Sequence, residues 1–195
     1  MSVPTRVLLW GRTIGAVAQP PGDAVASFQY DPEFADSSIE VSPIVMPLSS
    51  RVYGFAQLAG PAFRGLPGLL ADSLPDRFGN AVIDAWLARQ GRPPESFSAI
   101  DRLGYIGRRG MGALTFEPAT GPDPSRGQRL EMAALVDLAN HVLATQEGLQ
   151  THTPADDPTE GLMDILQVGT SAGGARAKAL IAWNPVTNEV RSGQI

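Results

Sequence analysis

A glycine-containing turn near the N-terminus, Gly11–Arg12, separates two short apolar segments, Val7–Trp10 and Ile14–Ala18. Glycine tolerates the positive backbone φ angle that the first position of a two-residue hairpin loop requires, so this pattern predicts a β-hairpin. A third segment, Val25–Tyr30, alternates in polarity and stops at Asp31–Pro32. Alternation over such a length indicates a strand with one buried face. The start of the chain is therefore expected to build a sheet.

Further extended pieces are expected at Ile39–Leu48 and Arg51–Phe55, and Met111–Phe116 is expected to return to the sheet as a strand. Short strands of alternating polarity form antiparallel sheets with one face buried and the other in water. The predicted fold class is α+β, with a small antiparallel β-rich N-terminal subdomain that also contains helices. A weak helical pattern covers Phe97–Leu103.

A helical period is clearer earlier in the chain, where Phe78, Val82 and Trp86 recur every fourth residue. Pro75 lies near the start of this pattern and Gly91 just past its end. Proline in the first turn and glycine after the last are typical helix boundaries. We therefore expect a helix between them.

The stretch 119–128 combines prolines, glycines and polar residues, a composition typical of a linker. We therefore divide the chain into a subdomain of residues 1–118, this linker, and a second unit of residues 129–195. In the second unit, an amphipathic helix is predicted over Glu131–Gly148. A shorter helix is predicted over Asp157–Leu166, with the aspartate as its N-cap.

Composition excludes several classes of protein. The chain has no cysteine, so it has no disulfide framework, thiolate metal site or cysteine nucleophile. Its net charge of -5 argues against a general nucleic-acid-binding surface, which normally carries a basic excess. Near the N-terminus the longest apolar run, Val7–Trp10, is too short for a signal peptide or a membrane span. We expect a cytoplasmic protein without membrane contact that meets DNA only through a partner.

The segment Gly169–Lys178 holds the densest chemical signal. Its glycines and alanines would let backbone N–H groups approach an anion closely, and Arg176 and Lys178 add positive charge. These features suit a nucleotide phosphate. The spacing alone is also compatible with an ordinary glycine-containing turn, because it fits neither the Walker A pattern nor the dinucleotide-binding pattern.

Read as a whole, Gly169–Leu180 resembles the glycine-rich loop of HipA-type serine/threonine kinases almost position for position. Leu66–Asp76 is similar to the leucine- and proline-rich motif of that family. Tyr105–Gly107, together with Gly110–Leu114, is similar to its glycine-rich return strand. The resemblance covers nearly the whole chain, and it implies that the second unit is the start of a kinase-like N-lobe.

The resemblance also implies site residues. The loop backbone contacts ATP in this family, and the family's autophosphorylated serine falls on Ser171, with Thr170 as a neighbouring alternative. A plain capping or turn-forming role for Ser171 stays open. The Mg²⁺ ligands and the catalytic residues of the family would follow the end of this sequence. The residues expected to bind ATP are Gly173, Gly174, Ala175, Arg176, Ala177 and Lys178.

Two functions are compatible with the resemblance. The first is the N-terminal part of a toxin kinase that phosphorylates a protein serine and is held by a helix-turn-helix antitoxin of the HipB type. The second is a stand-alone module that restrains a separate kinase. Glu189–Ile195 is expected to pair with Ala179–Trp183 as a hairpin. Because the chain would then end inside a sheet, we expect a truncated product or a fragment.

Other polar residues receive simpler explanations. Asp156 and Asp157 precede a predicted helix and are better explained as caps than as catalytic groups. His141 and His152 have no matched third ligand, so a metal site is not expected. Arg108–Arg109 could meet an acidic partner, but a solvated turn is the simpler interpretation.

Overall fold

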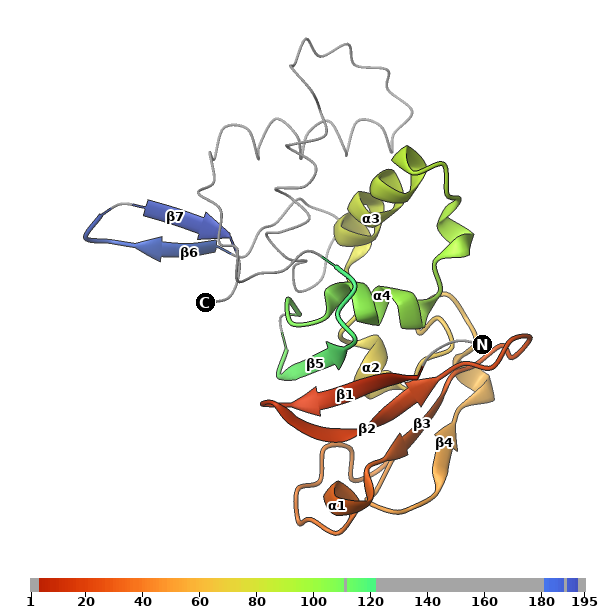
Figure 1. Ribbon diagram of the computed structural model, residues 1–195. Helices are drawn as coiled ribbons and strands as arrows, with labels where there is room; N and C mark the ends of the chain where they lie inside the picture. Colours follow the sequence, from red (N-terminus) through yellow and green to blue (C-terminus); the bar gives the residue numbers. More distant parts are fainter. Residues whose placement is uncertain (1–3, 111, 122–180, 188, 193–195) are drawn as a thin grey trace. The chain divides into compact units, whose positions relative to one another are not determined.

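The computed structural model describes residues 4–110, 112–121, 181–187 and 189–192 (Figure 1). The chain divides into two compact units. Unit 1 comprises residues 1–74 and 98–121, and unit 2 comprises residues 75–97 and 122–195. The predicted helices over 131–148 and 157–166 lie outside the described residues.

Unit 1 is built on one antiparallel sheet of five strands, in the order β4-β3-β2-β1-β5 (Figure 1). This sheet, with the helices beside it, confirms the predicted α+β fold of the N-terminal subdomain. The strand β1 lies next to both its sequence neighbour and the last strand of the unit. The strands are β1 (Thr5–Leu9), β2 (Arg12–Ala18), β3 (Ser27–Tyr30), β4 (Val52–Gly54) and β5 (Leu114–Glu117).

The predicted hairpin is confirmed, but its turn lies one residue earlier than expected. Leu9 pairs with Arg12, so the turn residues are Trp10 and Gly11, with φ angles of 49° and 81°. A two-residue hairpin turn with positive φ at both positions matches the twist of the strands on either side. The sequence pattern assigned the loop to the glycine and the arginine, because it put the glycine, which tolerates positive φ, at the first loop position.

The predicted strand at Ile39–Leu48 is wrong, since this segment forms turns and bends. Two tyrosines hold the segment beside the sheet instead. Tyr30 donates its hydroxyl hydrogen to the carbonyl oxygen of Met46 (2.8 Å), and Tyr53 donates to that of Pro47. These bonds occupy carbonyl groups that a strand would have paired with a neighbour. The segment after it was predicted correctly and is β4.

The helix α4 (Ala99–Ile106) confirms a helix where Phe97–Leu103 was expected, with both ends shifted forward. Ser98 and Asp101 form a capping box: the serine hydroxyl accepts from the Asp101 N–H (3.1 Å), and the carboxylate accepts from the Ser98 N–H (2.8 Å). Gly107, with φ of 53°, ends the helix. These local bonds, rather than the apolar spacing, set the boundaries.

Short helices in unit 1 were not predicted. In α1 (Pro32–Ala35), Asp31 accepts a hydrogen bond from the N–H of Glu33 (3.0 Å) and acts as the N-cap. The sequence analysis treated the Asp31–Pro32 pair as the end of a strand only. The remaining short elements are α2 (Gly68–Ala71) and the 3₁₀ turn η1 (Ala56–Leu58).

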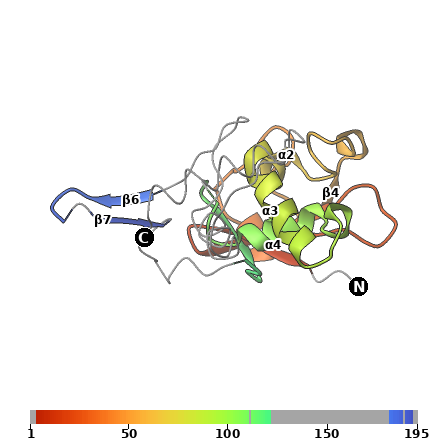
Figure 2. The same ribbon diagram turned by 90° about the horizontal axis from the view of Figure 1, so that it is seen from above.

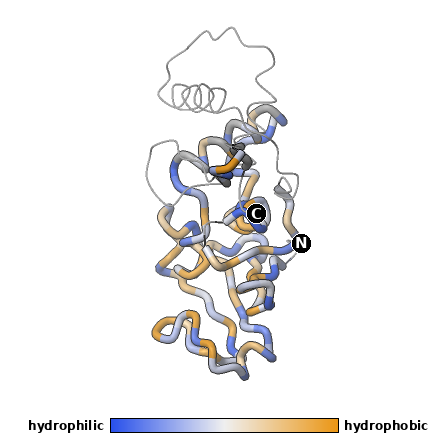
Figure 3. Tube along the Cα trace, turned by 90° about the vertical axis from the view of Figure 1, so that its left-hand side faces the viewer, coloured by the Kyte–Doolittle hydropathy of each residue, from blue (hydrophilic) through white to orange (hydrophobic). Residues whose placement is uncertain are grey.

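The core of unit 1 lies between the sheet and the two helices α2 and α4, and α4 packs on β1 and β5 (Figure 1, Figure 2). Apolar residues are interleaved with polar ones along the chain, as a sheet with one buried face requires (Figure 3). Phe28 at the centre contacts the ring of Tyr30 edge-on, with centroids 5.0 Å apart. Fully buried core residues include Val7, Ile14, Val17, Phe28, Leu66, Leu70, Leu103 and Phe116.

In unit 2 the structure describes α3 (Arg77–Arg89), the 3₁₀ turn η2 (Pro94–Ser96), and the paired strands β6 (Ile181–Asn184) and β7 (Glu189–Ser192). The helix expected before Gly91 and the C-terminal hairpin are thus confirmed. Asp76 caps α3 by accepting from the N–H of Gly79 (2.8 Å). The side chains of Phe78 and Val82 lie outside those described.

Gly15 offers a test of the packing in β2. A Cβ atom at this position would lie 2.3 Å from the carbonyl oxygen of Gln29 and 2.6 Å from Cζ of Phe28. We expect Gly15→Ala to lower the free energy of unfolding by about 1–3 kcal/mol, measured by urea denaturation. Gly60→Ala, whose Cβ would meet no atom within 4 Å, is the matched control and should not lower the free energy of unfolding. Equal midpoints for the two variants would contradict this packing.

Tyr30 predicts how stability depends on alkaline pH. Burial raises the pKa of its hydroxyl from 10.0 to about 12, with further contributions from Tyr53 and Glu40. Because the folded state holds this proton more tightly than the unfolded state, stability should fall as pH rises from about 10 to about 12. Tyr30→Phe lacks the bond to Met46, so at pH 8 its free energy of unfolding should be about 1 kcal/mol below that of the parent. Between pH 8 and pH 11 its stability should decline less than that of the parent, because it has no hydroxyl to ionise at this position. Thermal melts measure both proteins, and an equal fall in melting temperature between pH 8 and pH 11 would contradict the raised pKa of Tyr30.

Candidate functional site

The residues predicted to bind ATP, Gly173–Lys178, and the predicted phosphorylation sites, Thr170 and Ser171, lie outside the described residues. The same holds for His141, His152, Asp156 and Asp157. The nucleotide site therefore stays a prediction. What the structure does describe is the hairpin β6–β7 that follows the loop in sequence, and the two other motifs on which the resemblance rests.

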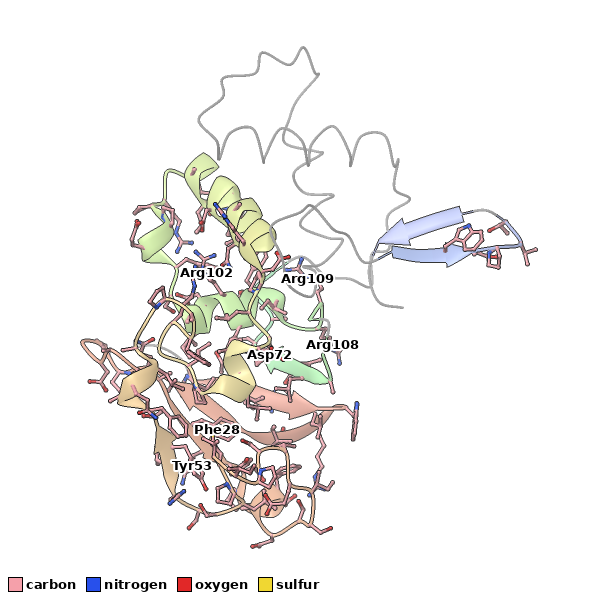
Figure 4. The ribbon with its side chains drawn as sticks, turned by 180° about the vertical axis from the view of Figure 1, so that it is seen from behind. Phe28, Tyr53, Asp72, Arg102, Arg108 and Arg109 are labelled. Atoms are coloured by element: carbon pink, nitrogen blue, oxygen red, sulfur yellow. The ribbon has the colours of Figure 1, made fainter. Side chains whose placement is uncertain are left out.

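The motif Leu66–Asp76 is mainly a packing element. Leu66 and Leu70 are fully buried in the core of unit 1. Leu70 belongs to α2, which ends just before Asp72, whose side chain is exposed (Figure 4). The last two residues of the motif belong to unit 2, where Pro75 accepts a hydrogen bond from Asn80 Nδ2 (2.7 Å). The motif thus ends unit 1 and leads into α3 of unit 2. Core packing accounts for its buried leucines, and the bond to Asn80 for Pro75, so neither requires a catalytic role.

The motif Tyr105–Leu114 forms a corner between α4 and β5. Tyr105 and Ile106 belong to the last turn of the helix, so their assignment to a return strand was wrong, and β5 begins only at Leu114. Gly107 turns the chain, and its carbonyl oxygen accepts from the N–H of Phe116 (3.0 Å). The glycines of the motif therefore serve a helix end and a tight return, rather than a long strand.

The side chain of Arg109 is buried inside this corner and contacts the end of α4. Its guanidinium donates to the carbonyl oxygen of Tyr105 (2.6 Å) and lies 4.7 Å from the centre of the Tyr105 ring. A cation at a helix C-terminus, bonded to one of the last carbonyl groups, stabilises the helix dipole. The side chain is only 6% exposed, whereas that of Arg108 is exposed, and Figure 4 places them on different sides of the turn.

This arrangement corrects the interpretation of Arg108–Arg109 as one solvated turn, which holds for the first arginine only. Two adjacent basic residues after a helix give no indication of which one turns inward. The nearest sequence signal is Gly107, because a glycine helix stop is often followed by a cation near the last carbonyl groups.

The electrostatics of the corner follow from burial. Burial raises the pKa of the Tyr105 hydroxyl to about 12, although the positive charge of Arg109 acts in the opposite direction. Burial also lowers the pKa of Arg109, and Tyr105 partly offsets this. Arginine nevertheless keeps its charge in proteins. The corner is therefore a charged, buried structural contact.

Within the ranges that the structure describes, no group of three histidine or acidic side chains is placed to hold a metal ion. No helix in the same ranges is long and apolar enough to cross a membrane.

A family of known proteins matches the chain over most of this architecture. The family described as HipA N-terminal domain matches residues 5–117, which is more than half of the 195-residue sequence. The chain belongs to the HipA N-terminal domain family. The predicted resemblance is thereby confirmed at the level of the family, over residues that include the motifs Leu66–Asp76 and Tyr105–Leu114. No curated protein matches the chain.

The HipA match follows the sheet of unit 1 closely. It begins at Thr5, the first residue of β1, and ends at Glu117, the last residue of β5. These two strands pair with each other, and Arg6 forms an ion pair with Glu117 across them. The HipA N-terminal domain thus corresponds to a stretch of chain that begins and ends on adjacent strands.

Arg109 should contribute to stability, whereas Arg108 should not. We expect Arg109→Met to lower the free energy of unfolding by about 1–3 kcal/mol, because it leaves a buried carbonyl group without its charged donor. Arg108→Met changes an exposed neighbour of the same type and should stay within about 0.5 kcal/mol of the parent. Chemical denaturation followed by circular dichroism measures both. Equal losses would contradict the structural role of Arg109.

Proposed function

We propose that the chain is the N-terminal part of a HipA-like protein serine/threonine kinase that binds ATP and phosphorylates a serine of a protein substrate. The observation that carries the proposal is the HipA family match over residues 5–117, followed in the same chain by Gly169–Lys178. A glycine-rich segment that follows a HipA N-terminal domain later in the same chain has the position that the kinase resemblance requires.

In this proposal the loop holds the phosphates of ATP. Backbone N–H groups from Gly173 to Lys178 would cradle the phosphate oxygens, because small side chains let the backbone come close. The side chains of Arg176 and Lys178 would neutralise charge. Phosphoryl transfer also requires Mg²⁺ and an aspartate that orients the acceptor hydroxyl. The resemblance assigns neither of these functions to a residue of this chain.

Ser171 would regulate the kinase. A phosphate on this residue adds about two negative charges next to the loop that receives the phosphates of ATP. Like charges would compete for the same N–H groups, so autophosphorylation should switch the kinase off. A helix-turn-helix antitoxin of the HipB type would restrain the kinase as well, and contact with DNA would be indirect, through this antitoxin.

The test uses the full product of the gene that encodes this chain, incubated with magnesium and radiolabelled ATP. We expect label on Ser171, its loss in Ser171→Ala, and a fall in ATP affinity of about tenfold or more in Lys178→Gln, which removes a phosphate-facing charge. Thr170→Ala is the matched control and should keep the label. If Thr170→Ala loses the label and Ser171→Ala keeps it, the phosphorylated residue is Thr170. Failure to bind ATP would overturn the kinase proposal.

The self-contained core and sheet of unit 1 favour a second function. The unit has its own buried core, and the family match spans its sheet from the first strand to the last. Such a unit could act as a separate module that restrains a kinase. Added to a HipA-type kinase that lacks this domain, the chain should then inhibit phosphorylation at a one-to-one ratio. No inhibition, together with ATP binding by the chain's own gene product, would eliminate the module.

A further inference from the structure

The β1–β2 turn presents a tryptophan in an unfavourable backbone conformation. Trp10 has a φ of 49° and an exposed fraction of 81%. A non-glycine residue in the left-handed region is strained, and asparagine or glycine is normally found at this turn position. The backbone N–H of Trp10 donates to the carbonyl oxygen of Ala113 (3.4 Å), a contact that any residue except proline could make.

The indole of Trp10 therefore contributes little to folding. An exposed side chain buries almost no apolar surface, so it cannot offset the strain of its own backbone. Strained residues that persist at the surface are found preferentially where they contact a ligand or partner. A single exposed apolar residue is ordinary. Trp10 and the exposed Arg64 are the described non-glycine residues with positive φ, and of these two only Trp10 is a large apolar side chain.

Two arginines lie at the same end of the sheet. Leu9 pairs with both Arg12 and Leu114, so the β1–β2 turn and the start of β5 lie at one end. Arg108 is exposed in the connection that leads to β5, and Figure 4 places it beside the start of that strand. We call Trp10, Arg12 and Arg108 the turn surface.

The orientation of Arg12 is defined by its contacts. Its guanidinium lies 5.3 Å from the centre of the Phe34 ring and donates to the backbone carbonyl oxygen of Glu33 (3.2 Å). The residue is nevertheless exposed and keeps donors for a further acceptor, because guanidinium has five N–H groups. The contact with Glu33 is to the backbone, so it does not neutralise the charge.

We propose that the turn surface docks an acidic, extended segment of a partner polypeptide. Tryptophan and arginine are the side chains that most often dominate binding energy at protein interfaces. Positive charge at this end matters because the chain as a whole has a net charge of -5, which would otherwise repel an acidic partner. Trp10 would cover the apolar part of the segment, while Arg12 and Arg108 would bind its carboxylates. The inference is independent of ATP binding.

The test is fluorescence anisotropy with the full chain and a labelled nine-residue peptide of alternating glutamate and leucine. We expect binding that weakens between low and physiological salt, because carboxylates and arginines attract each other through the solvent. Trp10→Asn should lower the affinity about tenfold or more, as should Arg108→Glu. Because asparagine suits the turn, Trp10→Asn should melt no earlier than the parent, which separates binding from folding.

Two controls make the result decisive. Ile44→Asn removes another exposed apolar side chain of unit 1, one that is 93% exposed, and should leave the affinity within about twofold. A peptide with lysine in place of glutamate should not bind. Unchanged affinity in Trp10→Asn, equal binding of the lysine peptide, or no binding at all would overturn the proposal. Self-association of the chain that disappears in Trp10→Asn would also overturn the proposal, because the turn surface would then bind a second copy of the chain.

Discussion

The pairing of β1 with β5 is the contact on which the rest of unit 1 depends. Arg6 and Glu117 lie opposite each other in this pair, although 111 positions separate them in the chain. Closing so long a loop costs entropy, which the continuous sheet and the packing of α4 on β1 and β5 must offset. The same pairing brings the corner after α4 to the end of the sheet where Trp10 turns, so both features follow from one strand pair.

The motifs that identify the family serve the fold more than the chemistry. The leucines of residues 66–74 fill the core, and the glycine-rich stretch before β5 shapes a corner closed by Arg109. A family match over such residues supports an architecture, while an activity must be argued from the groups that perform it. Kinase function therefore remains a proposal that rests on Gly169–Lys178, and the turn surface is a separate hypothesis about binding.

Sequence patterns predicted the parts of the fold that local physics governs. Alternation found β3, and a glycine located the first hairpin. The errors arose where tertiary contacts overrode local preference. Ile39–Leu48 resembles a strand, but tyrosine hydroxyl groups bind its carbonyl groups. Of the candidate site, the sequence predicted the nucleotide loop, which lies outside the described residues, and it missed the buried position of Arg109.

By itself, the sequence determined the class of fold and the family, and it predicted a phosphate loop, because period, turn chemistry and motif are local properties of the chain. Only the tertiary structure decided which of two adjacent arginines is buried, since that depends on where α4 ends relative to β5. It also decided that Trp10, and not Arg12, occupies the turn. The register of a hairpin is set by the pairing of whole strands, and one position of shift exchanges a turn residue for a strand residue.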